Sequence, residues 1–387
     1  MRQVYLDHQS STPLLPEARS AMQPFFSEAF GSPSSLHRHG LRVRDALAAA
    51  RAQVAALVKA RSTDDIIFTS GGTEAANLAV QGVAYASQRR GNHIVLSAVE
   101  HPAVENTVAF LEHHGFAATR VRVDAEGLLD PTDVRAALTD KTILICAHWA
   151  NHDLGTLQPV LELGRVAAAA GIPLFIDAST AAGWVPIDAP GFGVSLLSLT
   201  AHRFYGPKGV GALYRGKGVR LVGVQHGGAQ EGGRRAGTEN VPAIVGGGVA
   251  AEFAARELPR RSAHTARLQR RLWAGLQGRI DRLRLNGPEP GPRRLSTSLN
   301  TSAEFVEGEG WMLLADVNGI AVASGTSCVS KALKISPVLA AIGLDPALAQ
   351  GSILMSLGKD NTDDEIDYVV ETFDKIVDKL RRMSPTW

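Results

Sequence analysis

A glycine-rich turn at residues 70–74 is the first place where the chain could hold a ligand. The run Ser70-Gly71-Gly72-Thr73-Glu74 follows a short apolar segment and precedes a helical pattern from Ala75 to Val80. Backbone N–H groups at a helix N-terminus, together with the Thr73 hydroxyl, can converge on an anion. Taken alone, such residues are more often a tight strand-to-helix turn capped by Thr73. Gly72 and Thr73 are therefore candidate phosphate contacts.

An acidic residue, Asp177, ends the apolar run at residues 173–177. The carboxyl ends of parallel strands form the edge at which open α/β sheets bind ligands. Asp177 could pair there with a protonated ring nitrogen. A helix N-cap or an ion pair within the loop is the alternative interpretation.

Hydroxyl, imidazole and cationic side chains follow one another in Thr200-Ala201-His202-Arg203, just before the turn Gly206-Pro207-Lys208-Gly209. Further along, Ser324-Gly325-Thr326-Ser327-Cys328 places a thiol among small residues, as expected for an exposed loop with a reactive cysteine. The other cysteine, Cys146, lies in an apolar run and is expected to pack in the core.

Strand-length apolar runs alternate with helical patterns along the first two-thirds of the chain. This alternation predicts an α/β fold with a mainly parallel sheet flanked by helices. The expected strands are 66–69, 93–97, 118–123, 142–148 and 173–177, and clear helical patterns cover 41–59 and 161–170. A basic amphipathic helix is expected at 262–279. The basic region around it is interpreted as a solvated face, with docking of an acidic partner as the alternative, and contains Arg260, Arg261, Arg267, Arg270 and Arg271. A final helix at 362–383 begins with a capping box formed by Thr362 and Glu365.

Taken together, these motifs resemble the cysteine desulfurase family, which are pyridoxal-phosphate enzymes of fold type I. The resemblance extends over nearly the whole chain, through Tyr5-Leu6-Asp7, residues 31–37, Glu100-His101, residues 235–240 and Ser356-Leu357-Gly358-Lys359. It implies an α/β transferase-like fold with a large domain at 16–259, built on a seven-stranded mainly parallel sheet. Residues 1–15 and 260–387 would form a small α/β domain that carries the Cys328 loop.

The resemblance also implies roles for matching residues. His101 would stack on the cofactor ring and carry protons, and Cys328 would be the persulfide-bearing nucleophile. Thr200 and His202 would contact the cofactor phosphate, and Thr238 lies on a loop that relatives place at the neighbouring subunit's phosphate. A homodimer is therefore expected.

Four positions depart from the family's pattern. Arg203 stands where relatives have the lysine that forms the internal aldimine, and a guanidinium is not available as a neutral amine. Lys208 is no ready substitute, because the family has a lysine there as well. Thr180 and His152 replace a glutamine and an asparagine that contact the cofactor. Leu354 replaces an arginine that would hold the substrate carboxylate with two charge-assisted hydrogen bonds.

These departures leave three hypotheses. The first is a desulfurase-like protein without the standard activity, acting through Cys328 in sulfur transfer or iron–sulfur assembly, with a sulfur-acceptor or scaffold protein as partner. Pyridoxal phosphate would then be bound only noncovalently or be absent. The second is an active cysteine desulfurase with noncovalently bound pyridoxal phosphate, and the third is a fold type I enzyme with a changed substrate. The catalytic candidates are Cys328, His101 and Arg203.

Composition excludes several other classes. Forty Lys and Arg against 38 Asp and Glu give a formal charge of +2, too little to bind nucleic acid by neutralising phosphates. No apolar run reaches the roughly 18 residues that cross a bilayer. Two distant cysteines and scattered histidines provide no compact set of metal ligands. The N-terminus shows no signal-peptide pattern, so we expect a cytoplasmic protein.

Overall fold

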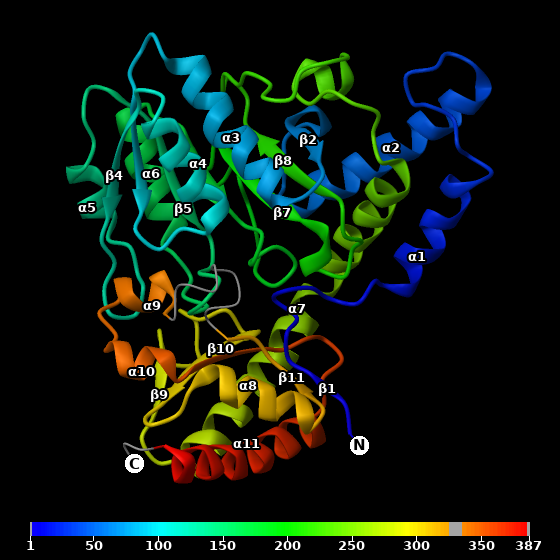
Figure 1. Cartoon of the computed structure of the whole chain (residues 1–387). Helices are drawn as coiled ribbons and strands as arrows, with labels where there is room; N and C mark the ends of the chain where they lie inside the picture. Colours follow the sequence, from blue (N-terminus) through cyan, green and yellow to red (C-terminus); the bar gives the residue numbers. More distant parts are fainter. Residues whose placement is uncertain (1, 325–334, 385–387) are drawn as a thin grey trace.

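A seven-stranded sheet forms the centre of the computed structural model, which describes residues 2–324 and 335–384 (Figure 1). In spatial order its strands are β2 (Ile66–Thr69), β8 (Gly211–Arg215), β7 (Leu196–Thr200), β6 (Leu174–Asp177), β5 (Thr142–His148), β3 (His93–Ser97) and β4 (Ala117–Val121). Strand β8 is antiparallel to both neighbours, and the other pairs are parallel. The mainly parallel α/β fold expected from the sequence is thus confirmed.

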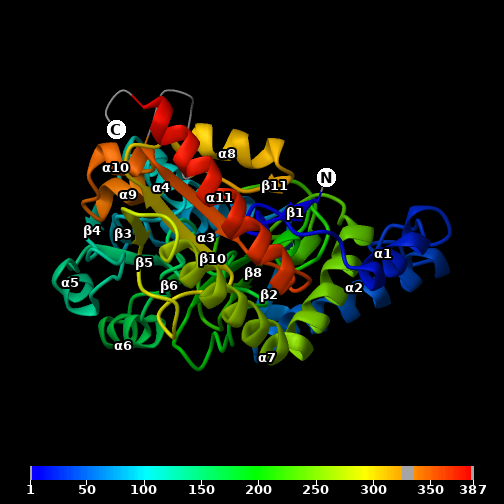
Figure 2. The same ribbon diagram turned by 90° about the horizontal axis from the view of Figure 1, so that it is seen from below.

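Helices cover both faces of this sheet (Figures 1 and 2). On one face, α3 (Gly72–Ser87) and α4 (Pro102–Glu112) bury Leu78 and Val108 against strand residues such as Leu96. The other face is covered chiefly by α2 (Arg38–Leu57), α6 (Val160–Ala170) and the first half of α7 (Val241–Gln277). The remaining elements of this part are α1 (Pro16–Met22), α5 (Pro131–Ala136) and the 3₁₀ helices η1 (Gln23–Phe26), η2 (Thr63–Asp65), η3 (Ala201–Arg203) and η4 (Gln230–Gly233).

A second, smaller core is built from both ends of the chain. Its strands are β1 (Val4–Tyr5) with β11 (Ile320–Ala321), and an antiparallel sheet of β12 (Ser352–Ser356), β10 (Ser298–Ala303) and β9 (Leu283–Asn286). Its helices are α8 (Gly308–Val317) and α11 (Asp363–Met383). Helices α9 (Pro337–Ala341) and α10 (Pro346–Gln350) belong to a separate small cluster that includes Val99 and Leu154. Val4 pairs with Ile320, and Trp311 packs on Phe373 with ring centroids 5.3 Å apart. The capping box of Thr362 and Glu365 is present at the start of α11.

Helix α7 joins the two cores. The helix expected at 262–279 is only its second half, because the structure begins it at Val241 and continues it through Pro259. The glycines of the first half hide the helical pattern in the sequence but allow close packing: a Cβ on Gly248 would lie 2.7 Å from the Cα of Ala50 in α2. The expected domain boundary at 259/260 falls inside this helix and stays a prediction.

The expectation of a solvated arginine face on α7 is wrong for Arg261. This side chain is buried, with its guanidinium 5.0 Å from the Trp184 ring and 4.9 Å from the Tyr205 ring. Arg267 and Arg271 form ion pairs with Asp363 and Asp367 of α11. The arginines therefore tie α7 to its neighbours rather than only facing water.

Membrane-spanning helices and metal sites can be assessed for the described residues. Within 2–324 and 335–384, none of the helices has both the length and the apolar character that crossing a bilayer requires. The same ranges contain no group of three or more His, Cys, Asp or Glu side chains able to hold a metal ion. Cys146 is buried in β5, as expected, and burial raises the pKa of its thiol.

Candidate functional site

Strand register brings the predicted site residues to one edge of the sheet. His148 at the end of β5 lies beside Asp177 at the end of β6, which in turn lies beside Ser198 in β7. The segment with Thr200, His202 and Arg203 continues directly from β7 into η3. The site thus lies at the carboxyl ends of parallel strands, as the sequence predicts.

Asp177 is a buried carboxylate held by two hydrogen bonds. It accepts one from the backbone N–H of Ser179 at 2.9 Å and one from the Ser198 hydroxyl at 2.8 Å. Burial raises the pKa of Asp177, but attraction to His101 and these hydrogen bonds outweigh burial, so the pKa lies below its ordinary value. A negative group fixed in this way suits a protonated ring nitrogen.

The glycine-rich turn begins helix α3 and packs against the same edge. A Cβ on Gly72 would lie 2.7 Å from the Ser179 hydroxyl oxygen and 3.4 Å from the Thr200 Cβ, so a side chain there would have to displace the Ser179 hydroxyl. Gly71 is the N-cap without a side-chain capping bond, and Thr73 is exposed rather than acting as the cap. The first N–H groups of α3 are therefore left available for an anion.

His101 and His152 form a neutral pair of rings next to Asp177. The His101 Nδ1 accepts a hydrogen bond from the Ala103 N–H at 3.1 Å, so its proton is on Nε2. The two ring centroids are 5.1 Å apart. Burial and mutual repulsion lower the pKa of His101 to about 4, and burial with the nearby His148 and Arg203 lowers the pKa of His152 to about 3. Both rings are thus neutral donors or acceptors near neutral pH.

Arg203 contacts another of the changed positions directly. Its Nη1 donates a hydrogen bond to the Thr180 hydroxyl at 2.8 Å, and its carbonyl accepts one from the Trp184 indole at 3.2 Å. The neighbouring His202 is half-buried, and burial, Arg203 and Lys208 lower its pKa to about 4. Lys208 itself is exposed. The guanidinium and the threonine hydroxyl therefore complement each other at the two positions where the family resemblance predicts lysine and glutamine.

A cavity of about 220 Å³ connects these residues with the small core. Arg203, His101 and His152 line it from the large part, and Leu354 of β12 lines it from the small part. Three of the four changed positions thus face one cavity, and the fourth, Thr180, is hydrogen-bonded to one of them.

Sequence reasoning missed two buried carboxyl groups that also line this cavity. Glu100 Oε1 pairs with His148 Nδ1 at 2.8 Å, and both side chains are almost fully buried. Asp153 accepts a hydrogen bond from Ser336, and burial raises its pKa to about 6. Their only signal in the sequence is that each is adjacent to a predicted histidine, and nothing in one sequence shows that they are buried.

Of the predicted site residues that the structure describes, only His101, His152 and Arg203 line this cavity. The predicted residues outside its lining are Gly72, Thr73, Asp177, Thr180, Thr200, His202 and Thr238. Thr238 is exposed and does not line the cavity of its own chain. Its loop is anchored by Glu231, which pairs with Arg51 at 2.7 Å. Cys328 lies outside the described residues, so its predicted role stays a prediction.

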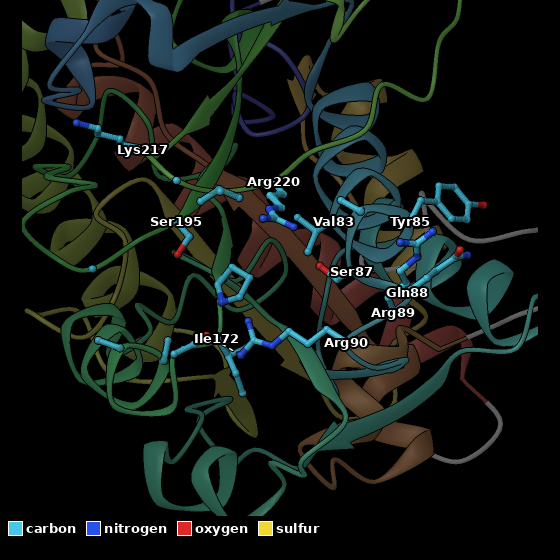
Figure 3. Close-up of a pocket in the computed structure, with 18 residues that line it drawn as sticks. Val83, Tyr85, Ser87, Gln88, Arg89, Arg90, Ile172, Ser195, Lys217 and Arg220 are labelled. Carbon is cyan, nitrogen blue, oxygen red and sulfur yellow. Dashed lines mark hydrogen bonds between the residues drawn. The ribbon is translucent and has the colours of Figure 1, made fainter.

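A larger cleft, about 840 Å³, lies away from these residues (Figure 3). It is lined by Arg90, Lys217 and Arg220 and by Ser195, which precedes β7. None of the residues singled out in the sequence lines it. The cleft therefore lies near the amino end of β7. Asp177, in contrast, lies at the carboxyl end of β6, and Arg203 follows the carboxyl end of β7.

Comparisons with known proteins agree with the geometry. Residues 4–369 match the family described as aminotransferase class-V. The chain is 43% identical over 386 residues to "Cysteine desulfurase IscS" of Clostridium botulinum, covering 100% of this chain and 97% of that protein. It is 44% identical to "Cysteine desulfurase IscS" of Dictyoglomus turgidum, covering 99% and 97%. A solved structure titled "NIFS-LIKE PROTEIN" superposes with a TM-score of 0.91 at 32% identity, covering 98% of this chain and 100% of that chain.

Proposed function

Since the chain belongs to the cysteine desulfurases of the aminotransferase class-V family, we propose that it has lost the standard desulfurase reaction and acts in sulfur transfer or iron–sulfur assembly through Cys328. The observation that carries this proposal is Arg203, whose guanidinium is hydrogen-bonded to Thr180 at 2.8 Å. A guanidinium keeps its proton, so it cannot attack an aldehyde as a neutral amine. A homodimer, an acceptor or scaffold partner and a cytoplasmic location remain predictions.

The retained residues fit pyridoxal phosphate bound without a covalent link. Asp177 would hold the protonated ring nitrogen, and His101 would lie against the ring. Gly72, Thr73 and Thr200 would hold the phosphate. Within the described residues, the buried Nδ1 of His202 has no hydrogen-bond partner, which suits a further contact to a phosphate oxygen. When bound, this group supplies an electron-withdrawing ring.

The altered residues do not supply a base for removing a proton from an amino acid. The amine is absent at position 203, and the pKa of His101 lies at about 4. The proton of His101 is on Nε2, because Nδ1 accepts from Ala103, so the free face of the ring donates rather than accepts. General acid–base catalysis contributes about 10²–10⁴ in rate, and neither Arg203 nor His101 supplies the base for it. Leu354 in turn cannot hold a substrate carboxylate.

The proposed transfer needs no oxidant. The Cys328 thiolate attacks the outer sulfur of a donor persulfide, R–S–SH, so that a new S–S bond forms at Cys328 while the donor's S–S bond breaks. The donor leaves as a thiolate, and the proton of its persulfide stays with the transferred sulfur or passes to water. A second transfer of the same kind passes this sulfur to an acceptor thiol.

Mass spectrometry tests this proposal. The purified protein is incubated with glutathione persulfide, or with cysteine and pyridoxal phosphate. We expect one extra sulfur on Cys328 with the persulfide only, and none in Cys328→Ser. Absence of sulfur on Cys328 after persulfide treatment contradicts the sulfur-transfer role. Release of alanine from cysteine well above a buffer control contradicts the lost reaction and favours an active desulfurase with noncovalently bound cofactor.

A further inference from the structure

The cleft of about 840 Å³ near the amino end of β7 gathers positive charge. Among the described residues that line it there are four cations and no carboxylate; the cations are Arg89, Arg90, Lys217 and Arg220. The whole chain has a formal charge of only +2, so the positive charge is concentrated at this cleft. A concave surface lined by one sign of charge attracts ligands of the opposite sign.

The four cations come from two segments that are distant in the sequence. Arg89 and Arg90 directly follow helix α3, and Lys217 and Arg220 lie in the segment that follows strand β8. Figure 3 shows Arg90 and Arg220 near the middle of the residues drawn, whereas Lys217 lies toward one side. A ligand in the cleft would therefore be contacted from two sides.

The charges of these side chains are not neutralised within the protein. In the ranges 2–324 and 335–384, none of the four cations forms an ion pair. Arg90 Nη2 donates a hydrogen bond to the carbonyl of Gly171 at 3.0 Å, which is a neutral acceptor at the end of α6. Because a guanidinium has five N–H donors, this contact orients Arg90 and leaves other donors for an anion.

The segment that carries Lys217 and Arg220 is fixed to the sheet. The N–H of Gly216 donates to the carbonyl of Ser195, which also lines the cleft, at 2.8 Å. Arg215 Nη1 donates to the carbonyl of Val219 at 2.9 Å. This wall of the cleft is thus formed before a ligand arrives, which lowers the entropy that binding has to offset.

The number and type of the cations favour phosphate groups over a single carboxylate. Guanidinium N–H groups match the oxygens of a phosphate in pairs, and a ligand with several linked phosphates brings several negative charges to several cations. The volume lies within the range of about 300–1,000 Å³ that is usual for small-molecule sites. The buried apolar residues Val83 and Ile172 also line the cleft, so a less polar group attached to the phosphates has a surface to contact.

We propose that this cleft binds a di- or triphosphate group, either free or as the end of a nucleotide, with its phosphate oxygens on Arg90 and Arg220. Arg89 and Lys217 add positive charge at the rim, where both side chains are exposed. The inference does not depend on the proposed sulfur transfer. The cleft lies at the amino end of β7, and the altered site with Arg203 follows its carboxyl end.

Isothermal titration calorimetry with tripolyphosphate, at constant ionic strength, tests the inference on the purified full chain. We expect tripolyphosphate to bind at least about ten-fold more tightly than orthophosphate. Arg220→Gln and Arg90→Gln should each weaken binding about 10- to 100-fold, the effect expected for losing a hydrogen bond to a charged group. Arg220→Lys should retain most of the affinity. Arg270→Gln, the matched control, removes an exposed arginine that does not line the cleft and should leave binding unchanged.

Two further arms locate the ligand and identify its source. Thr73→Val alters the proposed pyridoxal phosphate site and should leave tripolyphosphate binding unchanged. Tighter binding of ATP than of tripolyphosphate would identify a nucleotide, and equal or weaker binding of ATP would identify a free polyphosphate.

Three results would overturn the inference. The first is that tripolyphosphate binds no more tightly than orthophosphate. The second is that Arg220→Gln, an exposed position at which thermal unfolding should be unchanged, binds as tightly as the parent. The third is that Thr73→Val weakens binding as much as Arg220→Gln does, which would place the ligand at the other edge of the sheet.

Discussion

The two sides of the site differ in how much of the family's pattern they keep. On one side, Gly72, Asp177 and Thr200 retain the residues expected to hold a phosphate and a ring nitrogen. On the other, Thr180, Arg203 and Leu354 stand where the family resemblance predicts residues that react or hold the substrate. The retained side is built from buried strand ends and a close backbone approach, and the changed side from side chains around a cavity. The scaffold that binds and the groups that react can therefore change separately.

Restoring the family's residue types on the changed side of the site should have the largest effect, and this effect is on desulfurase activity. A variant with Arg203→Lys, Leu354→Arg, Thr180→Gln and His152→Asn returns the family's residue types to all four positions. We expect alanine release from cysteine to rise about 10²–10⁴-fold, the usual contribution of a positioned acid–base group. Arg203→Lys alone should already give a lysine adduct with pyridoxal phosphate that borohydride fixes and mass spectrometry locates. A restored variant as inactive as the parent would show that the two sides are not separable.

The side of the site that contains Asp177 should bind pyridoxal phosphate more weakly when this carboxylate is removed. Asp177→Asn keeps the shape but removes the carboxylate, and hydrogen bonds to charged groups are worth about 1.5–3 kcal/mol. We expect affinity for pyridoxal phosphate to fall about 10- to 100-fold in equilibrium dialysis. Thr180→Ser, on the changed side, is the matched control and should leave this affinity nearly unchanged. Equal losses in both variants would contradict the comparison.

Stability should depend on pH through the two neutral histidines. Burial lowers the pKa of His101 to about 4 and that of His152 to about 3, whereas the unfolded chain titrates near 6.5. Between these values the unfolded state binds more protons, so stability falls as pH falls, by up to about 1.4 kcal/mol per pH unit for each group.

His152→Asn removes one of these groups and returns the family's residue. In urea unfolding between about pH 6 and about pH 4, it should reduce the dependence of the unfolding free energy on pH. Asp153 acts in the opposite direction, because burial raises its pKa to about 6 from 3.8, so its contribution grows as pH falls through that window. A variant with an unchanged slope would show that His152 is not buried as a neutral ring.

The smallest effect is expected from Thr180→Ala. It removes the acceptor of the 2.8 Å hydrogen bond from Arg203, and the net value of such a bond is about 1 kcal/mol. Urea unfolding measures this loss. Thr180→Ser restores the hydroxyl and should recover it, and no difference between the two variants would mean that the contact is not stabilising.

Local sequence patterns predicted five of the seven strands of the central sheet but neither β7 nor β8, and they predicted the buried contacts poorly. The runs 66–69, 93–97 and 142–148 coincide with β2, β3 and β5, because buried parallel strands are continuous apolar runs. The position of Asp177 at the carboxyl end of β6 was also predicted. The Arg203–Thr180 hydrogen bond, the Glu100–His148 pair and the burial of Arg261 were not, since each joins loops or helices that meet only after the whole chain has packed.

The pairing of Val4 with Ile320 in β1 and β11 has a consequence for synthesis. Strand β1 finds its partner only when residue 320 has also left the ribosome, after all strands of the central sheet have been synthesised. Because domains usually fold as units from the N-terminus onward, the large core would fold while β1 still lacks its partner strand β11. Ordering of that segment would then be a late event in the maturation of each molecule.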